Sequence, residues 1–397
     1  MINQHYKSML NAKSVIRELS EYAAARGRKI GRENVFDFSL GNPSVPVPES
    51  YTASVINRYR TMASTDLHGY SPSLGIPEVR EAVAASLRRR FGLPYEAGHI
   101  FMTSGAAGAI AHAVRATSRP GDVVLTFAPF FPEYIPYVEG TGARLEVVPA
   151  DTEDFQANLE GLDRMLTPRV QAVLINTPNN PSGALWTEET VEKLAKILRR
   201  KQEEYGHDIF LISDEPYREI VFDGKKAPYP AAYYDNSLTC YSFSKSLSVP
   251  GERIGYVAVN PRATDAKLLA AMFGQISREI GHNCPASTAQ YGICDCIDQT
   301  SDLSVYEVNR NLLYETLVDL GFSVTRPGGT FYIFPKCLEE DAGAFCRKAV
   351  KYDLILVPSD NFGLPGYFRM AYCMDTDKVR RSLPVLRAFV EREYPKR

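Results

Sequence analysis

The sequence predicts an α/β protein: a large domain with a mostly parallel seven-stranded sheet between helices, plus a small α+β domain. Three observations support this prediction. The chain has 397 residues, which is too long for one ordinary core. After the first hundred residues, short apolar runs alternate with helical segments, a pattern typical of parallel strands covered on both faces. From about residue 300 a long helical segment is followed by short strands and further helices.

The elements of the large domain follow from these runs. A helix is expected within AAGAIAHAVRATS, between the first two strands. Another is expected within TEETVEKLAKILRRKQEEYG, because Thr187 can cap its start and Gly206 can end it. The seven predicted strands span 99–103, 122–128, 144–150, 171–178, 208–215, 238–244 and 255–259.

The domain boundaries follow from where the pattern changes. Residues 1–45 are expected to form a helix and an extended segment that join the small domain. Residues 46–290 are expected to form the large, ligand-binding domain, and residues 291–397 the small C-terminal domain.

Composition narrows the class of protein. The net charge of −2 gives no electrostatic reason to expect nucleic acid or an anionic membrane as a partner. The N-terminus lacks the apolar core of a signal peptide, and no later stretch is apolar enough to span a bilayer. The seven scattered cysteines and the absence of an HxxxH pair predict reduced thiols and no metal site. We therefore expect a cytoplasmic protein.

The predicted strand ends carry polar or glycine-rich clusters, and ligands of such sheets bind beyond these ends. Ser104, Gly105, Ala106 and Ala107 open a helix whose N–H groups can approach an anion, although a plain tight turn has the same pattern. Phe131 follows the second strand and can stack on a planar ring or fill the core.

The fourth and fifth strands are followed by chemically active groups. Asn180 lies in a proline-rich turn after the fourth strand, where its side-chain amide can donate to a ligand, although a plain loop has the same pattern. Asp214 and Tyr217 follow the fifth strand, where a buried carboxylate needs a partner such as a cationic ring nitrogen; helix capping is the alternative.

The sixth strand ends in Ser242 and Lys245, with Arg253 eight residues beyond the lysine. A lone lysine is usually a solvated charge. Burial near a second cation lowers the pKa of a lysine and makes its amine a nucleophile. Taken together, the strand ends offer a phosphate cradle, a stacking ring, a carboxylate for a pyridinium, a phenol and a lysine, which is the set that holds pyridoxal phosphate.

With these motifs in order, the sequence resembles the class I/II aminotransferases, the fold-type I pyridoxal-phosphate enzymes of the aspartate aminotransferase superfamily. The resemblance covers nearly the whole chain, and SFSK followed by GERIG is its most specific part. The matching stretches are GNP (41–43), YSPSLG (70–75), TSGAAGA (103–109), PFFPEY (129–134), NTPNNPSG (176–183), SDEPY (213–217), SFSK…GERIG (242–255) and FRMAY (368–372).

The resemblance implies a role for each of the cofactor residues. Lys245 resembles the lysine that binds the cofactor covalently and then moves the substrate's proton. Asp214 resembles the residue that keeps the pyridine nitrogen protonated, and Tyr217 and Asn180 the pair that hydrogen-bonds the ring 3-oxygen. Phe131 takes the stacking position. The implied phosphate binders are Ser104, Gly105, Ala106, Ala107, Ser242 and Arg253.

The resemblance also implies how substrate binds. Arg369 resembles the arginine that grips the α-carboxylate, with Asn180 beside it, and Gly41 lies where the family closes a loop over the substrate. Tyr70 resembles the tyrosine that reaches the phosphate of a neighbouring subunit, which implies a homodimer with shared active sites.

Substrate choice rests on Arg278. Its spacing to Asn283 resembles the stretch where dicarboxylate-specific relatives keep a distal-carboxylate arginine, but a surface arginine paired with Glu279 or with solvent is as good an interpretation. The leading hypothesis is an aspartate aminotransferase: an aspartate or glutamate donor, 2-oxoglutarate as acceptor, and ping-pong kinetics. Alternatives are alanine or aromatic donors, a C–S β-lyase on the same fold, and an inactive scaffold.

Overall fold

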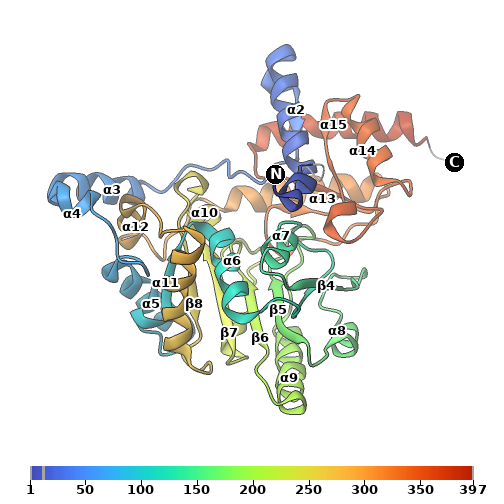
Figure 1. Ribbon diagram of the computed structural model, residues 1–397. Helices are drawn as coiled ribbons and strands as arrows, with labels where there is room; N and C mark the ends of the chain where they lie inside the picture. Colours follow the sequence, from blue (N-terminus) through green and yellow to red (C-terminus); the bar gives the residue numbers. More distant parts are fainter. Residues whose placement is uncertain (1, 11–13, 396–397) are drawn as a thin grey trace.

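The computed structural model describes residues 2–10 and 14–395, and its centre is a seven-stranded sheet (Figure 1). The strand order is β2-β8-β7-β6-β5-β3-β4, and all neighbours pair in parallel except β8, which is antiparallel to both β2 and β7. This confirms the predicted α/β fold with a mostly parallel sheet. The strands are β2 (Ile100–Thr103), β3 (Val123–Phe127), β4 (Arg144–Val148), β5 (Val170–Asn176), β6 (Phe210–Asp214), β7 (Ser237–Ser242) and β8 (Gly255–Val259).

Helices cover both faces of this sheet because its strands are apolar on both sides. In β3, Val124 packs toward α6 and α11, whereas Val123 and Leu125 pack toward α9. Figure 1 shows α6 and α11 in front of the sheet. The helices of this domain are α3 (Glu49–Thr61), α4 (Ser64–His68), α5 (Pro77–Phe91), α6 (Gly105–Thr117), α7 (Tyr134–Glu139), α8 (Leu159–Met165), α9 (Glu188–Tyr205), α10 (Phe243–Ser246), α11 (Ala266–Ile280) and α12 (Ser287–Cys294).

The predicted caps of α9 are present. The Thr187 side chain accepts a hydrogen bond from the Thr190 N–H, and Gly206 ends the helix in the left-handed conformation.

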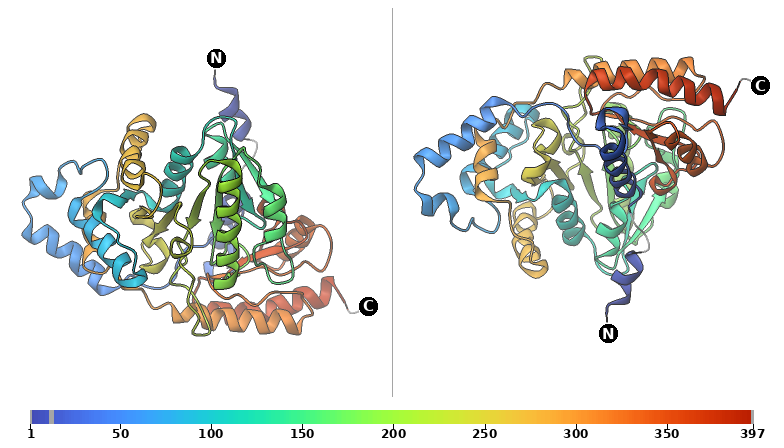
Figure 2. Two further views of the ribbon diagram at one scale, coloured as in Figure 1. Left: turned by 90° about the horizontal axis from the view of Figure 1, so that it is seen from below. Right: turned by 90° about the horizontal axis from the view of Figure 1, so that it is seen from above.

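The small domain packs helices on two short sheets. Helices α13 and α15 lie side by side (Figure 2). The N-terminal segment is part of this unit, because Phe36 and Asp37 pair in parallel with Leu354 and Ile355. Its elements are α2 (Val15–Ile30), β1 (Phe36–Asp37), α13 (Ser304–Asp319), β9 (Tyr332–Ile333), α14 (Ala342–Val350), β10 (Leu354–Ile355), β11 (Val357–Pro358), β12 (Phe368–Ala371) and α15 (Thr376–Glu393). The short helix α1 (Gln4–Met9) precedes α2, and its Tyr6 and Met9 line one pocket with Phe130 and Pro132 of the large domain. Short 3-10 turns are η1 (Arg32–Asn34), η2 (Ala97–His99), η3 (Pro230–Ala232), η4 (Pro250–Glu252) and η5 (Asp360–Phe362).

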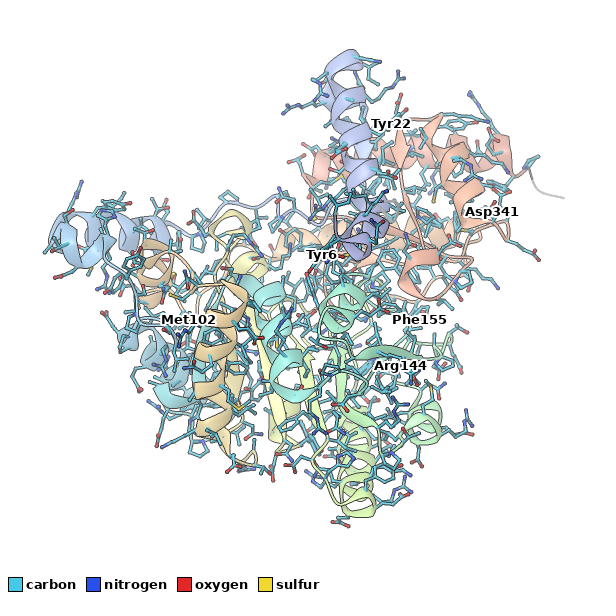
Figure 3. The ribbon with its side chains drawn as sticks, in the orientation of Figure 1. Tyr6, Tyr22, Met102, Arg144, Phe155 and Asp341 are labelled. Atoms are coloured by element: carbon cyan, nitrogen blue, oxygen red, sulfur yellow. The ribbon has the colours of Figure 1, made fainter. Side chains whose placement is uncertain are left out.

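Aromatic side chains join the two domains. Phe155, from the large domain, makes edge-on contacts with Phe334 and Tyr367 of the small domain at ring separations of 6.0 and 5.9 Å. Figure 3 labels Phe155 at this junction.

The structure bears on one predicted domain boundary, the one between residues 290 and 291. Position 290/291 falls inside α12, and Ala289 and Ile293 of that helix belong to the same core cluster as Val83 of α5. We propose to place the boundary between α12 and α13 instead, after residue 294.

The stretch 322–336, expected to contribute short strands, differs from the prediction. Only Tyr332–Ile333 form a strand there. The preceding residues bind the large domain instead: Gly328 and Gly329 donate to the Gly183 carbonyl.

Within the described ranges, no helix is long and apolar enough to cross a membrane. The same residues hold no cluster of three or more His, Cys, Asp or Glu side chains suited to a metal ion.

Candidate active site

One edge of the large sheet gathers most of the predicted site residues. Since β2, β3, β5, β6 and β7 run in one direction, their carboxyl ends meet there, and β8 starts from the same edge. The turns that follow these strands therefore face one another across a common space.

Asp214 ends β6 in a buried position with one oxygen engaged and one free. The Tyr134 hydroxyl donates to Asp214 Oδ2 at 2.6 Å, and Oδ1 has no hydrogen-bond partner within the described residues. Burial raises the pKa of Asp214 to about 7, and the hydrogen bond from Tyr134 opposes this rise. A buried acceptor of this kind suits a cationic N–H donor.

Asn180 and Arg369 connect the large and small domains. The backbone N–H of Asn180 donates to Asn176 Oδ1 at 2.6 Å, which fixes the turn after β5. The Asn180 side-chain oxygen then accepts a hydrogen bond of 3.1 Å from the Arg369 guanidinium on β12. A second Arg369 nitrogen donates to the Ser39 carbonyl at 2.5 Å.

Arg369 is a buried cation without a carboxylate among the described residues. It is 1% exposed, its Nε has no partner, and no salt bridge is formed by it. Its guanidinium lies 4.5 Å from the Tyr332 ring centre and 5.2 Å from that of Phe362. Burial lowers the pKa of Arg369. Such a group can bind a ligand carboxylate through charge-assisted hydrogen bonds.

Lys245 lies on the short helix α10 and points to the same space. Its Nζ donates to the Gly41 carbonyl at 2.7 Å and lies 5.4 Å from the Phe331 ring centre. Burial lowers the pKa of Lys245 to about 8; nearby Cys373 opposes this, and Arg253 and Arg369 add to it. A lowered pKa leaves more of the amine unprotonated and nucleophilic near neutral pH.

The turn between β2 and α6 forms a cradle with Arg253. Gly105 has a φ of +74°, and a Cβ there would lie 2.7 Å from an Arg253 nitrogen. That arginine also donates to the Ser104 carbonyl at 3.2 Å. The first N–H groups of α6, at Gly105, Ala106 and Ala107, have no partner within the helix, so cation and N–H groups together suit a phosphate.

Two further predicted cofactor residues lie near these groups. Ser242 is buried at the end of β7, and its hydroxyl accepts a hydrogen bond from the Ser244 N–H. Phe131 is partly buried, and its ring meets that of Tyr134 edge-on at 5.8 Å.

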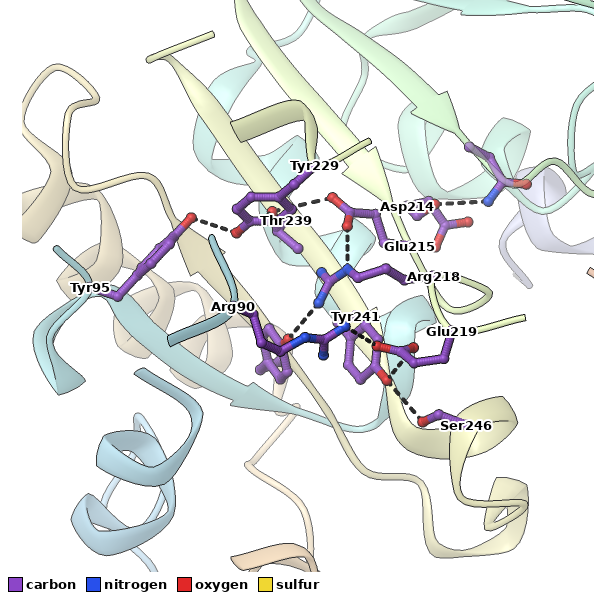
Figure 4. Close-up of polar contacts among 12 residues, drawn as sticks. Arg90, Tyr95, Asp214, Glu215, Arg218, Glu219, Tyr229, Thr239, Tyr241 and Ser246 are labelled. Atoms are coloured by element: carbon purple, nitrogen blue, oxygen red, sulfur yellow. Dashed lines mark hydrogen bonds and ion pairs between the residues drawn. The ribbon is translucent and has the colours of Figure 1, made fainter. Parts of the chain in front are cut away.

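A buried polar network supports the residues that follow Asp214 and Lys245 (Figure 4). Glu215 accepts a hydrogen bond of 2.7 Å from Arg218, whose guanidinium lies 4.7 Å from the Tyr241 ring centre. The Tyr241 hydroxyl lies 2.9 Å from the Ser246 oxygen. This network holds the two turns from behind, with its charges paired.

Two predicted site residues do not lie with the others at this edge of the sheet in the single chain. Tyr70 is fully exposed on the loop after α4. Arg278 is exposed near the end of α11 and lines a groove of about 480 Å³ with Ser73, Gln275 and Asn283. Among the described residues it forms no ion pair with Glu279, and its exposure is what a solvated surface arginine would also show.

Several contacts could not be assigned from sequence. Tyr134 was expected only as an aromatic in PFFPEY, yet it is the hydrogen-bond partner of Asp214. Asn176, the first residue of NTPNNPSG, holds Asn180. Phe362 and the Ser39 carbonyl at Arg369 have no sequence signal, since they depend on how the domains pack.

With this geometry established, comparison with known proteins identifies the family. The family model described as "Aminotransferase class I and II" matches residues 33–386. The chain belongs to this family.

Relatives of this aminotransferase differ in the substrates that their names give. It is 30% identical to a protein of Aquifex aeolicus named "Probable aspartate/prephenate aminotransferase", over 87% of this chain and 88% of the relative. It is 28% identical to an "Aromatic-amino-acid aminotransferase 2" of Thermococcus litoralis, over 89% and 91% of the two chains.

Solved structures agree with the fold of this aminotransferase. The crystal structure of an aminotransferase from Eubacterium rectale matches all of both chains with a TM-score of 0.96 at 42% identity. The aspartate aminotransferase of Thermus thermophilus with maleate matches 95% of this chain and 97% of its own, with a TM-score of 0.85 at 25% identity.

Enzymes of this family and fold depend on pyridoxal phosphate, and the residues of this chain fit that group. The free Oδ1 of Asp214 suits a protonated ring nitrogen. The cradle at Gly105 and Arg253 suits a phosphate, and the Lys245 amine suits an aldehyde.

Proposed function

We propose that this aminotransferase moves an amino group from an L-amino acid of the aspartate or glutamate type to a 2-oxo acid such as 2-oxoglutarate, in two half-reactions. The observation that most supports amino acid binding is Arg369: a buried guanidinium without a carboxylate partner in the described structure, held by Asn180 in the same space as Lys245.

The proposed roles follow from the contacts of each residue. Pyridoxal phosphate, when bound, supplies an aldehyde for amines and a conjugated ring that accepts the electron pair of the substrate's α-carbon. Lys245 would hold the cofactor through its aldehyde group, and its amine, when free, would take the proton from the substrate's α-carbon. Asp214 accepts a hydrogen bond from the ring nitrogen, which keeps that nitrogen protonated.

The remaining residues orient the ring. Tyr217 and Asn180 donate to the ring 3-oxygen, and Phe131 stacks on the ring face. Phosphate binding falls to Ser104, Gly105, Ala106, Ala107, Ser242 and Arg253.

Substrate is held at both ends in this proposal. Arg369 binds the α-carboxylate, and Gly41 provides the loop that covers it. Arg278 binds the distal carboxylate of a dicarboxylic donor; its exposed side chain beside the 70–75 loop, unpaired in the described structure, supports this role.

We include a homodimer and a cytoplasmic location in the proposal. Tyr70 is a fully exposed aromatic, which supports a role across a subunit interface. The seven cysteines are all free, as expected in a reducing compartment.

A panel of donors tests the substrate. The wild-type protein, supplied with cofactor and 2-oxoglutarate, is expected to use aspartate with a higher kcat/KM than alanine or phenylalanine. Arg278→Ala should lower kcat/KM for aspartate about 100-fold, since a charge-assisted bidentate contact is lost. It should change the value for alanine less than about twofold.

Gln275→Ala, which alters the same groove one turn earlier on α11, is the matched control and should leave all donors unchanged. Unchanged aspartate turnover in Arg278→Ala would remove Arg278 from the proposal. Release of pyruvate and a thiol without any amino acceptor would favour the β-lyase instead.

A further inference from the structure

Tyr332 occupies the point where the cofactor residues and the carboxylate-binding residues meet. It lies on β9 of the small domain, is 3% exposed, and pairs with Ala371 next to Arg369 on β12. No role follows for it from the residues assigned above, which lie on the strand ends around it.

Its ring and its hydroxyl have different partners. The ring centre lies 4.5 Å from the Arg369 guanidinium carbon, a cation–π distance at which desolvation strengthens the attraction. The hydroxyl lies 3.3 Å from the Tyr217 hydroxyl. This is longer than a typical O–H···O bond, and such contacts often shorten when the ligand binds.

The backbone before Tyr332 is held in a strained conformation. Thr330, a β-branched residue, has a φ of +63°, in the left-handed region that such residues rarely adopt. Its N–H donates to the Ile220 carbonyl at 2.9 Å, and its hydroxyl accepts from the Tyr332 N–H at 3.0 Å. The large domain thus fixes the position at which Tyr332 enters the site.

A glycine lies against the hydroxyl end of the Tyr332 ring. A Cβ on Gly41 would lie 1.9 Å from the Tyr332 hydroxyl oxygen, so this loop approaches Tyr332 as closely as the backbone allows. Gly41 is also the residue whose carbonyl accepts from Lys245. Tyr332 is therefore confined among the three groups that the proposed reaction uses.

We propose that Tyr332 is a positioning residue with two separable functions, an inference that rests on the proposed function. Its ring holds the guanidinium plane of Arg369 for the α-carboxylate of any donor. Its hydroxyl donates to Tyr217, so that the Tyr217 proton is directed to the ring 3-oxygen of the cofactor. One side chain thereby aligns substrate and cofactor with each other.

The direction of the hydrogen bond between Tyr332 and Tyr217 determines whether the pH midpoint of the cofactor's absorption rises or falls when that bond is lost. A Tyr217 hydroxyl that accepts from Tyr332 is a stronger donor, because linked hydrogen bonds polarise one another. A stronger donor stabilises negative charge on the 3-oxygen and lowers the pH at which the visible absorption of the bound cofactor changes.

Two variants separate the functions in the cofactor-loaded enzyme. Tyr332→Phe removes only the hydroxyl and should raise the midpoint of the absorption titration by about half a pH unit, with KM for donors changed less than about twofold. Tyr332→Leu removes the ring as well and should raise KM about tenfold for donors of every side-chain class, because the α-carboxylate is common to all.

Tyr372→Phe is the matched control. Tyr372 is a buried tyrosine of the same domain whose hydroxyl donates to the Thr330 carbonyl at 3.3 Å, and its loss should move neither the midpoint nor KM.

An unchanged midpoint in Tyr332→Phe overturns the hydroxyl function. An unchanged KM in Tyr332→Leu, or a rise for one donor class alone, overturns the ring function. Since Tyr332→Phe retains the packing, the test remains decisive if Tyr332→Leu does not fold. Failure of the proposed function differs from these results, because wild-type protein supplied with cofactor would then show neither the absorption band nor amino transfer.

Discussion

Three buried arginines of this chain differ in how their charge is balanced. Arg218 pairs with Glu215, and Arg310 pairs with Asp223 at 2.9 Å. Arg369 has no carboxylate among the described residues and is held by carbonyl oxygens and aromatic rings. A buried charge that lacks its counter-ion is costly unless a ligand supplies one. The charges of the first two arginines are therefore balanced within the fold, whereas that of Arg369 is left for the substrate carboxylate of the proposed function.

Asp214 gives a pH-dependent prediction for the cofactor-free protein. Its pKa of about 7 in the folded state lies above the ordinary value of 3.8, so folding favours the protonated form. The contribution of this carboxyl group to stability is therefore present below about pH 4 and is lost as the pH rises to about 7.

Asp214→Asn removes this dependence. We expect the melting temperature of the cofactor-free variant to exceed that of wild type by several degrees at pH 8 and to match it near pH 4. Thermal melting at both pH values measures this. A difference that is the same at pH 4 and pH 8 would contradict the assignment.

At the scale of elements, the turn from β2 into α6 shows how backbone conformation builds a binding site. The positive φ of Gly105 aims the start of α6 at Arg253, and the missing side chain leaves room for the guanidinium. Gly255 at the start of β8 has a related role, since a Cβ there would lie 3.0 Å from the Gly105 Cα. Gly251, by contrast, faces open space.

Gly105→Ala tests this turn. The added methyl group collides with Arg253, and we expect cofactor affinity to fall at least tenfold, together with a loss of stability of about 1 kcal/mol from the left-handed backbone. Gly206→Ala is the matched control, because Gly206 has a φ of +69° with no atom within 4 Å of the added methyl. It should lose similar stability and no cofactor affinity, as measured by cofactor titration and thermal melting.

The elements that the sequence predicts well are those marked by a run of apolar residues, because such runs are usually buried. Most strands of the large sheet are buried and apolar, with the edge strand β4 as the exception, and each is found within a residue or two of its predicted bounds. Their order placed Asn180, Asp214, Tyr217 and Lys245 at one sheet edge. The hydrogen bond from Tyr134 to Asp214 was not predictable, because a buried tyrosine in α7 has the same sequence pattern whichever carboxylate it meets.

The strands expected between residues 322 and 331 were predicted wrongly for a different reason: contacts with the large domain override the local preference for a strand. The stretch 322–331 has the apolar and aromatic residues of a strand, yet Gly328, Gly329 and Thr330 donate their N–H groups to the large domain. Those bonds replace a strand ladder. The same contacts place Tyr332 in the site, so the feature missed by pattern analysis is the one that underlies the further inference.

At the scale of the whole molecule, the site depends on contacts between its two domains. Asn180 of the large domain binds Arg369 of the small domain, and Lys245 binds the Gly41 carbonyl of the N-terminal segment. Either domain alone lacks part of this set. We therefore expect relative domain motion to change substrate and cofactor contacts together.

The proposed dimer with shared sites would give Tyr70 a function although this residue is remote from the site within one chain. We expect light scattering to give twice the mass of one chain, and Tyr70→Ala to weaken cofactor binding about tenfold. Tyr22→Ala, an exposed tyrosine on α2 labelled in Figure 3, is the control and should leave binding unchanged. A fully active monomer would refute the shared site.

The position of the cofactor is the central claim, and one measurement tests it most directly. The protein is loaded with pyridoxal phosphate, reduced with borohydride so that any lysine linkage becomes permanent, digested and analysed by mass spectrometry. We predict that the cofactor mass appears on the peptide containing Lys245, and that Lys245→Ala abolishes both this adduct and amino transfer. An adduct on another lysine, or none at all in protein that still transfers amino groups, would contradict the account.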